Sequence, residues 1–112
     1  MKQILIFIIL SFFAINVFAN QQIVNVYNWS DYIPKKVIQL FGQRTGVRVN
    51  YTTYTSNPEL YAKLLADPDS GYDVVFPSSY YVQRMAKEGM LHRLNLKRLS
   101  NFEYLNPVLL NR

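Results

Sequence analysis

The sequence predicts an α/β fold with a largely parallel sheet, because segments typical of strands alternate with segments typical of helices along the chain. Apolar residues make up 50% of the 112 residues and aromatic residues 15%, which argues against a long disordered chain. The chain contains no cysteine, so disulfide scaffolds and cysteine-ligated zinc or iron–sulfur sites are excluded. The length is typical of one domain.

Residues 1–19 have the composition of a signal peptide. Lys2 supplies a positive start, an almost unbroken apolar run follows at residues 4–13, and Val17-Phe18-Ala19 resembles a cleavage site. The apolar stretch is interrupted by polar residues and is shorter than the roughly 20 residues that a membrane-spanning helix needs. An uncleaved anchor is the alternative interpretation. We expect cleavage after Ala19, export to the periplasm and a remaining protein of residues 20–112.

The first part of that remaining chain predicts a strand, a helix and a second strand. Residues 23–28 are rich in Val and Tyr and carry no charge, as is typical of a strand. Pro34 suits the first position of a helix that continues to Thr45, and Gly46 suits its end. Residues 47–53 alternate apolar and polar side chains, which predicts a half-buried strand. The helix has one apolar face, made by Val37, Leu40 and Phe41.

The same alternation continues after residue 56. Asn57-Pro58 is typical of a helix start, and the turn at residues 67–71 separates this helix from the next apolar run. Gly89 ends a further helix. The expected elements are a helix from Asn57 with Leu60, Leu64 and Leu65 on its apolar face, a fully buried strand at 72–76, a helix at 80–88, a short strand at 90–94 and short helical turns from Lys97 onward.

Two connections are candidates for a ligand site, because ligands of parallel sheets lie beyond the carboxyl ends of the strands. The first connection comprises residues 28–32 and the second comprises residues 77–81. An aromatic face attracts an ammonium group, and a carboxylate binds it by a charge-assisted hydrogen bond, so this surface favours an aliphatic amine over a sugar or an anion. The alternative is that the rings only pack the rim of the core. The candidate residues are Trp29, Asp31 and Tyr32 in the first connection, with Ser78 and Tyr80 in the second.

No pattern supports catalysis, a cofactor or a metal site. The single histidine, His92, lies outside both connections, and the sequence has no nucleophile elbow or phosphate-binding loop. The turn at residues 67–71 lacks the further ligands of a calcium loop. The formal net charge of +5 is spread over the chain without a block of like charges, which argues against nucleic acid. A basic exported domain that binds an anionic surface remains the alternative function.

The run from Val26 to Pro34 resembles the N-terminal signature of the periplasmic spermidine/putrescine-binding proteins of polyamine ABC transporters. The resemblance is collinear and covers essentially the whole chain after residue 19. Any one motif is a weak signal, but their sequence together is specific. The other matching motifs are Tyr51-x-x-Tyr54-x-Ser56-Asn57, Ala62–Leu65, Gly71–Ser78, Tyr80–Val82, Lys87–Met90 and Leu99–Phe102.

The resemblance implies a type II periplasmic binding fold, in which two α/β lobes close on a polyamine, and it implies the transporter's membrane permease subunits as partners. It implies no enzymatic activity. Because proteins of this family continue well beyond this point, we expect an incomplete first lobe and weak or absent binding of spermidine or putrescine. A different small solute is a further alternative. By the resemblance Asp31 would bind an ammonium group, Trp29, Tyr32 and Tyr80 would enclose the methylene chain, and Ser30 and Ser78 would be minor polar contacts.

Overall fold

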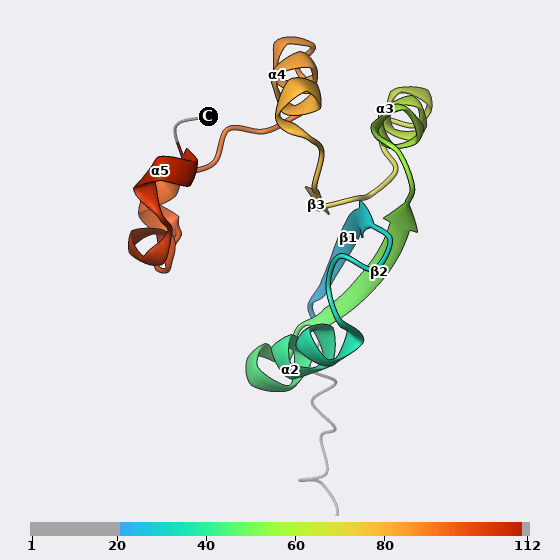
Figure 1. Ribbon diagram of the computed structural model, residues 1–112. Coiled ribbons are helices and arrows are strands. Elements are labelled where there is room, and N and C mark those ends of the chain that lie inside the picture. The colour runs from blue at the N-terminus through green and yellow to red at the C-terminus, as the bar shows by residue number, and fades with distance from the viewer. Residues whose placement is uncertain (1–20, 111–112) are drawn as a thin grey trace, which may run out of the picture.

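The computed structural model describes residues 21–110 (Figure 1), so the predicted signal peptide lies outside the described residues. Within residues 21–110, no helix has the length and apolar character that crossing a membrane requires. The elements in chain order are β1 (Ile23–Trp29), α2 (Lys35–Thr45), β2 (Arg48–Tyr54), α3 (Asn57–Ala66), β3 (Val74–Val75), α4 (Ser79–Lys87), η2 (Leu96–Arg98), η3 (Phe102–Tyr104) and α5 (Pro107–Leu110).

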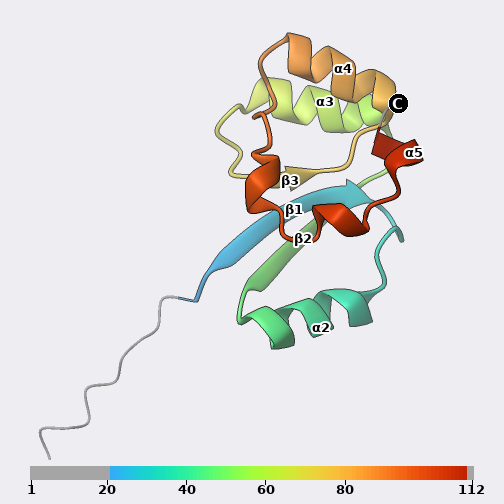
Figure 2. The same ribbon diagram turned by 90° about the vertical axis from the view of Figure 1, so that its left-hand side faces the viewer.

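The strands form a parallel sheet in the order β2-β1-β3, which confirms the predicted α/β class. β1 pairs with β2 along its whole length, from Ile23 opposite Arg48 to Trp29 opposite Tyr54. Figure 2 shows α2 on one side of the sheet and α3 with α4 on the other. The register therefore brings the carboxyl ends of β1 and β2 to the same edge, beside the connection that leads into α4.

Local sequence signals explain where the helices begin and end. Gly46 adopts a left-handed conformation (φ 71°) after α2, and its N–H donates to the carbonyl of Gly42. At the start of α3 the Ser56 hydroxyl accepts a hydrogen bond from the Glu59 N–H at 3.3 Å. The Glu59 carboxylate in turn accepts from the N–H of Thr55 at 2.8 Å. This reciprocal capping fixes the first turn of α3 directly after β2.

The core is small and lies between the sheet and α3. Tyr27, Tyr54 and Leu60 are fully buried and form one cluster. The rings of Tyr27 and Tyr54 meet edge to face with centroids 4.9 Å apart, and Tyr72 stacks on Tyr27 at 4.6 Å. Edge-to-face and offset-stacked pairs are the favoured aromatic geometries. The Lys63 ammonium lies 5.2 Å from the centroid of the Tyr27 ring, so a positive charge lies at the edge of this core.

Two expectations about the strands at the edge of the sheet are wrong. Residues 90–94 form no strand among the described residues, and β3 is limited to two residues, with Val74 40% exposed in place of the expected buried strand. The helix α2 has no buried residue, and Val37 and Leu40 are exposed. β3 pairs with β1 alone, and within the described residues its other edge takes up no further strand.

From η2 onward the chain stands apart from the sheet in Figure 1 and consists of the short helical turns that the sequence predicts. Residues 88–92 line a hollow of about 800 Å³ with Leu64, Leu65, Val74 and Val82. The apolar character that suggested a strand at 90–94 therefore belongs to the wall of this hollow.

Candidate functional site

The ends of all described strands are joined by one backbone carbonyl, that of Phe76. The Trp29 indole N–H donates to this oxygen at 2.8 Å, and the Tyr54 hydroxyl donates to it at 2.6 Å. Trp29 ends β1, Tyr54 ends β2, and Phe76 follows β3 directly. The two connections that the sequence singles out are thus held together through hydrogen bonds to the residue that precedes the second.

Trp29 is half-buried and packs against the core cluster, so the expectation that it lines the rim of the core holds in part. Its ring centroid lies 4.8 Å from that of Tyr54 at an interplanar angle of 56°. Tyr54 is only 1% exposed, and its burial raises the pKa of its hydroxyl to about 12. The hydroxyl is therefore protonated at neutral pH and remains a hydrogen-bond donor.

The other predicted ligand residues of the first connection, Ser30, Asp31 and Tyr32, are exposed. Asp31 is exposed and adopts a left-handed backbone conformation with φ 56°, which no other non-glycine residue of the described chain shows. Aspartate tolerates this region better than most residues. Tyr32 is 66% exposed. The Ser30 N–H donates to the Tyr54 carbonyl at 3.0 Å, and its hydroxyl lies 3.4 Å from the same oxygen. Ser30 thus extends the pairing with β2.

The second connection begins α4. Ser78 precedes the helix, its hydroxyl makes no capping hydrogen bond, and its N–H donates to the side-chain oxygen of Asn57 at 3.0 Å. Tyr80 is 68% exposed, and its ring meets that of Tyr81 edge to face at 5.5 Å. The structure therefore links Ser78 to the strand ends through Asn57, whereas the Tyr80 ring contacts its own helix.

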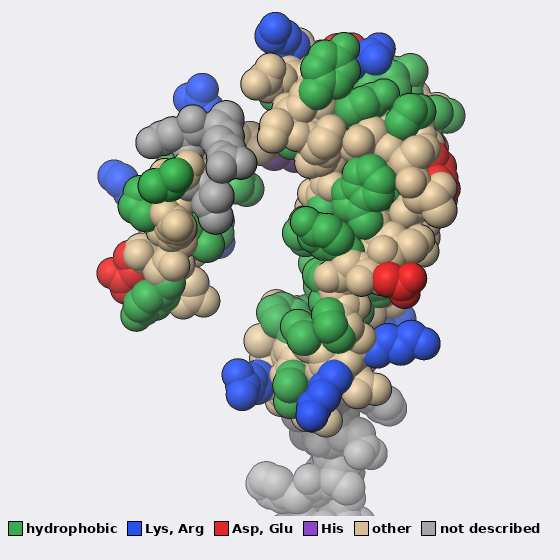
Figure 3. All heavy atoms as spheres, in the orientation of Figure 1, with side chains coloured by type: hydrophobic (Ala, Val, Ile, Leu, Met, Phe, Trp, Pro, Cys, Tyr) green, Lys and Arg blue, Asp and Glu red, His purple; other side chains and the backbone are tan. Residues whose placement is uncertain are grey.

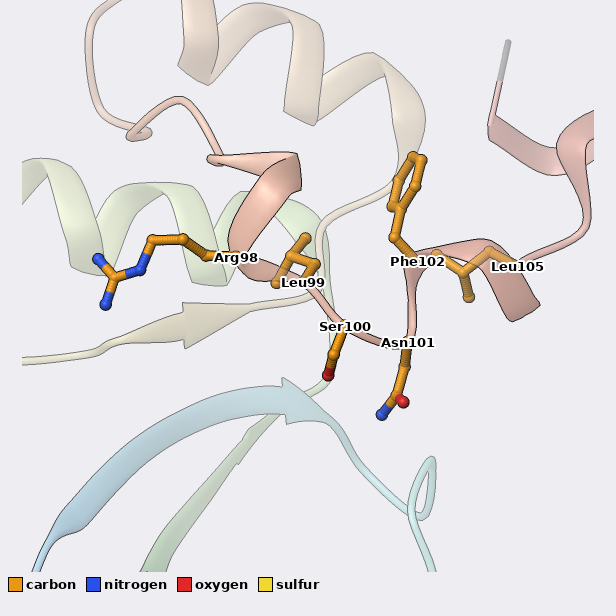
Figure 4. A pocket seen from close by; sticks show the side chains of 6 residues that line it. All are labelled: Arg98, Leu99, Ser100, Asn101, Phe102 and Leu105. Carbon is orange, nitrogen blue, oxygen red and sulfur yellow. The ribbon is translucent and has the colours of Figure 1, made fainter.

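Neither of two hollows in the described chain is lined by the predicted ligand residues. One measures about 290 Å³ and is formed by the C-terminal turns alone, from Arg98 to Phe102 with Leu105 (Figure 4). The other is the apolar hollow of about 800 Å³ beside β3. Apart from the half-buried Trp29, the predicted ligand residues are thus exposed outside both hollows, and the Asp31 carboxylate follows Trp29 by two residues in the chain.

Within residues 21–110, neither the basic side chains nor the potential metal ligands form a competing site. In Figure 3 the Lys and Arg side chains are scattered over the visible face without gathering in one patch, while hydrophobic side chains border the hollow space between the body and the C-terminal turns. Among residues 21–110 no group of His, Asp and Glu has the arrangement of a metal site. His92 lies in the wall of the larger hollow, away from both connections.

Tyr54 and Asn57 hold the segment between Phe76 and Ser78 by hydrogen bonds, but the sequence analysis did not assign them to the site. Both lie in one of the motifs that carry the resemblance described above, but no role was expected for either residue. A signal was present, because the expected parallel pairing of the first two strands places the end of the second strand beside Trp29. What the sequence could not supply is the common acceptor, a backbone carbonyl.

Comparison with known proteins relates the chain to binding proteins. It is 45% identical over 86 residues to the spermidine/putrescine-binding periplasmic protein of Salmonella typhimurium, covering 77% of this chain and 25% of the relative. It is 42% identical over 93 residues to the putrescine-binding periplasmic protein SpuD of Pseudomonas aeruginosa, covering 83% of this chain and 25% of that relative. No family model matches the sequence.

A solved structure gives the same relation. The spermidine/putrescine ABC transporter substrate-binding protein PotD from Streptococcus pneumoniae superposes with a TM-score of 0.77 and 33% identity, over 81% of this chain and 28% of that one. This similarity confirms a partial type II periplasmic binding fold. The chain spans about a quarter of the length of the curated relatives it matches. By sequence and by fold, the chain is therefore a homologue of the polyamine-binding periplasmic proteins of ABC transporters, over about a quarter of their length.

Proposed function

We propose that this chain contributes part of a binding surface for spermidine or putrescine in a periplasmic uptake system, with the transporter's membrane permease as partner and without catalysis. The names of its relatives support the ligand class and the periplasmic location. One structural observation carries the proposal: the Trp29 indole is fixed by its hydrogen bond to the Phe76 carbonyl, close in sequence to the exposed carboxylate of Asp31. An aromatic ring held in place and an exposed carboxylate two residues further along the chain are the groups that bind an ammonium group on a hydrocarbon chain.

The expected affinity of this surface is low. An exposed carboxylate–ammonium pair contributes about 0–1 kcal/mol, and an exposed cation–π contact contributes about 0.5–1 kcal/mol. A dissociation constant of 1 mM corresponds to about 4 kcal/mol of binding free energy. Since Asp31 and Tyr32 face solvent, the chain should bind polyamines with a dissociation constant above about 1 mM at physiological salt.

Weak binding of this kind can be measured by nuclear magnetic resonance of the ¹⁵N-labelled full chain. Titration with spermidine or putrescine should shift the resonances of residues 29–32 and the single indole N–H, since the chain has one tryptophan. The variant Asp31→Asn removes the charge and keeps a side chain that tolerates positive φ. Asp69→Asn is the matched control, because Asp69 is another exposed carboxylate in a turn.

The proposal expects the shifts to become much smaller in Asp31→Asn and to persist in Asp69→Asn. Shifts that are equal in all three proteins would contradict a role for Asp31. Micromolar affinity would contradict the argument from an exposed site. Binding to vesicles of anionic lipid, with no response of the Trp29 fluorescence to polyamine, would instead favour the alternative of a basic domain on an anionic surface.

A further inference from the structure

The Phe76 carbonyl oxygen accepts two hydrogen bonds from side chains of different strands. Trp29 approaches from β1 with its indole N–H at 2.8 Å, and Tyr54 approaches from β2 with its hydroxyl at 2.6 Å. A carbonyl oxygen has two lone pairs, so these donors use its full capacity. The indole and the phenol are also in contact, with centroids 4.8 Å apart. The orientation of the Trp29 ring thus depends on where Tyr54 holds this oxygen.

Tyr54 is suited to hold it. The residue is 1% exposed and packs edge to face against Tyr27 in the core, so its ring cannot move without disturbing that cluster. Its raised pKa keeps the hydroxyl a donor throughout the physiological range. Asn57, three residues further along, accepts from the Ser78 N–H at 3.0 Å. The segment between Phe76 and Ser78 is therefore tied at both ends to residues that follow or end β2.

We propose that Tyr54 is a positioning residue of the polyamine surface: through the shared Phe76 carbonyl it holds the Trp29 indole in the orientation that presents its face to the ligand. The role toward the ligand rests on the proposed function, whereas the effect of Tyr54 on the orientation of the indole does not depend on a ligand. Tyr54 itself does not touch the ligand. Removing its hydroxyl leaves the Phe76 carbonyl held by Trp29 alone, so the oxygen and the indole gain freedom to move together.

The test uses Tyr54→Phe, which keeps the ring and removes the hydroxyl. Tyr51→Phe is the matched control, because Tyr51 lies on the same strand and its buried hydroxyl has no hydrogen-bond partner within residues 21–110. The single tryptophan gives one indole N–H resonance, whose exchange with solvent reports its hydrogen bond. Circular dichroism checks that each variant is folded. If Tyr54→Phe does not fold, Asn57→Ala replaces it in the test, because it removes the hydrogen bond that holds the Ser78 end of the segment between Phe76 and Ser78.

Indole exchange in Tyr54→Phe should be about fivefold faster than in the wild type, the factor that corresponds to the roughly 1 kcal/mol of one hydrogen bond. Asn57→Ala should change it in the same direction, and Tyr51→Phe should leave it unchanged. In the spermidine titration, Tyr54→Phe should weaken binding about threefold, because a mobile indole loses part of the cation–π contact.

Unchanged or slower exchange in Tyr54→Phe would overturn the proposal, as would an equal acceleration in Tyr51→Phe. Faster exchange with unaltered spermidine affinity would also overturn it, since the orientation of the indole would then have no effect on binding. If the wild-type chain shows no response to spermidine, the proposed function fails and the role toward a ligand fails with it. The exchange rates, measured without ligand, still decide separately whether Tyr54 holds the indole.

Discussion

Replacement of Leu60 by alanine tests whether the small core between the sheet and α3 determines the stability of the chain. Leu60 is 0% exposed and is one of the buried apolar side chains of residues 21–110, with Tyr27, Tyr54 and Met85. Truncation of a buried leucine costs about 2–5 kcal/mol, depending on how far the surroundings collapse into the cavity. Two of its neighbours in the cluster are tyrosines held by their ring contacts, so collapse is restricted and we expect a loss of about 3 kcal/mol.

Leu65→Ala is the matched control, because it makes the same chemical change in the same helix at a side chain that is 57% exposed. It should alter the free energy of unfolding by about 0.5 kcal/mol or less. The assay is urea unfolding followed by circular dichroism and by the fluorescence of Trp29, with the slope m compared between proteins. Equal losses in the two variants would refute the reasoning, because they would show that the Leu60 cluster is not packed as a core.

Two pH-dependent predictions follow from groups near the strand ends. The pKa of Tyr54 is about 12 in the folded chain, against an ordinary value of 10.0. The stabilisation contributed by its protonated hydroxyl should therefore be fully present below about pH 10 and should be lost as the pH rises from about 10 to 12. The urea midpoint should fall less over this range in Tyr54→Phe than in the wild type, and an equal fall would exclude Tyr54 as the source. At the start of α3, the hydrogen bonds from the Thr55 N–H and hydroxyl hold the pKa of Glu59 below 4.5. Stability should therefore decline as the pH falls below about 4.5, and the decline should be less steep in Glu59→Gln. A decline of the same steepness in Glu59→Gln would exclude Glu59 as its source. At neutral pH, Ser56→Ala should lower the free energy of unfolding by about 1 kcal/mol, because it removes the cap of α3.

Local patterns were sufficient for the elements whose stability is local. Gly46 correctly predicted the end of α2, and Asn57-Pro58 correctly predicted the start of α3, although the capping side chain is that of Ser56, one residue earlier. The alternation of residues 47–53 predicted β2, because one face of that strand is more buried than the other. In these cases a residue's own neighbours along the chain supply the partner groups.

Non-local features were not predictable in the same way. Residues 90–94 have a strand-like composition, but a strand exists only where another strand accepts its hydrogen bonds, and no described strand does so here. The candidate site shows the same limit. The sequence identified Trp29 as an aromatic face, but the group that orients it is the carbonyl of Phe76, and a backbone carbonyl has no sequence signature. The third participant, Tyr54, becomes visible only once the register of β1 and β2 is known.

Salt should affect the contributions of Asp31 and Tyr54 to polyamine binding differently. Asp31 would act by its charge on an exposed surface, where the interaction is screened over about 8 Å at physiological ionic strength. Tyr54 would act by orientation, through a partly buried hydrogen bond between uncharged groups, which salt screens much less. The residual spermidine binding of Tyr54→Phe should therefore weaken with added NaCl as steeply as that of the wild type. Binding that remains in Asp31→Asn should depend on NaCl much less, and equal salt dependence in the two variants would show that the positions do not differ in kind.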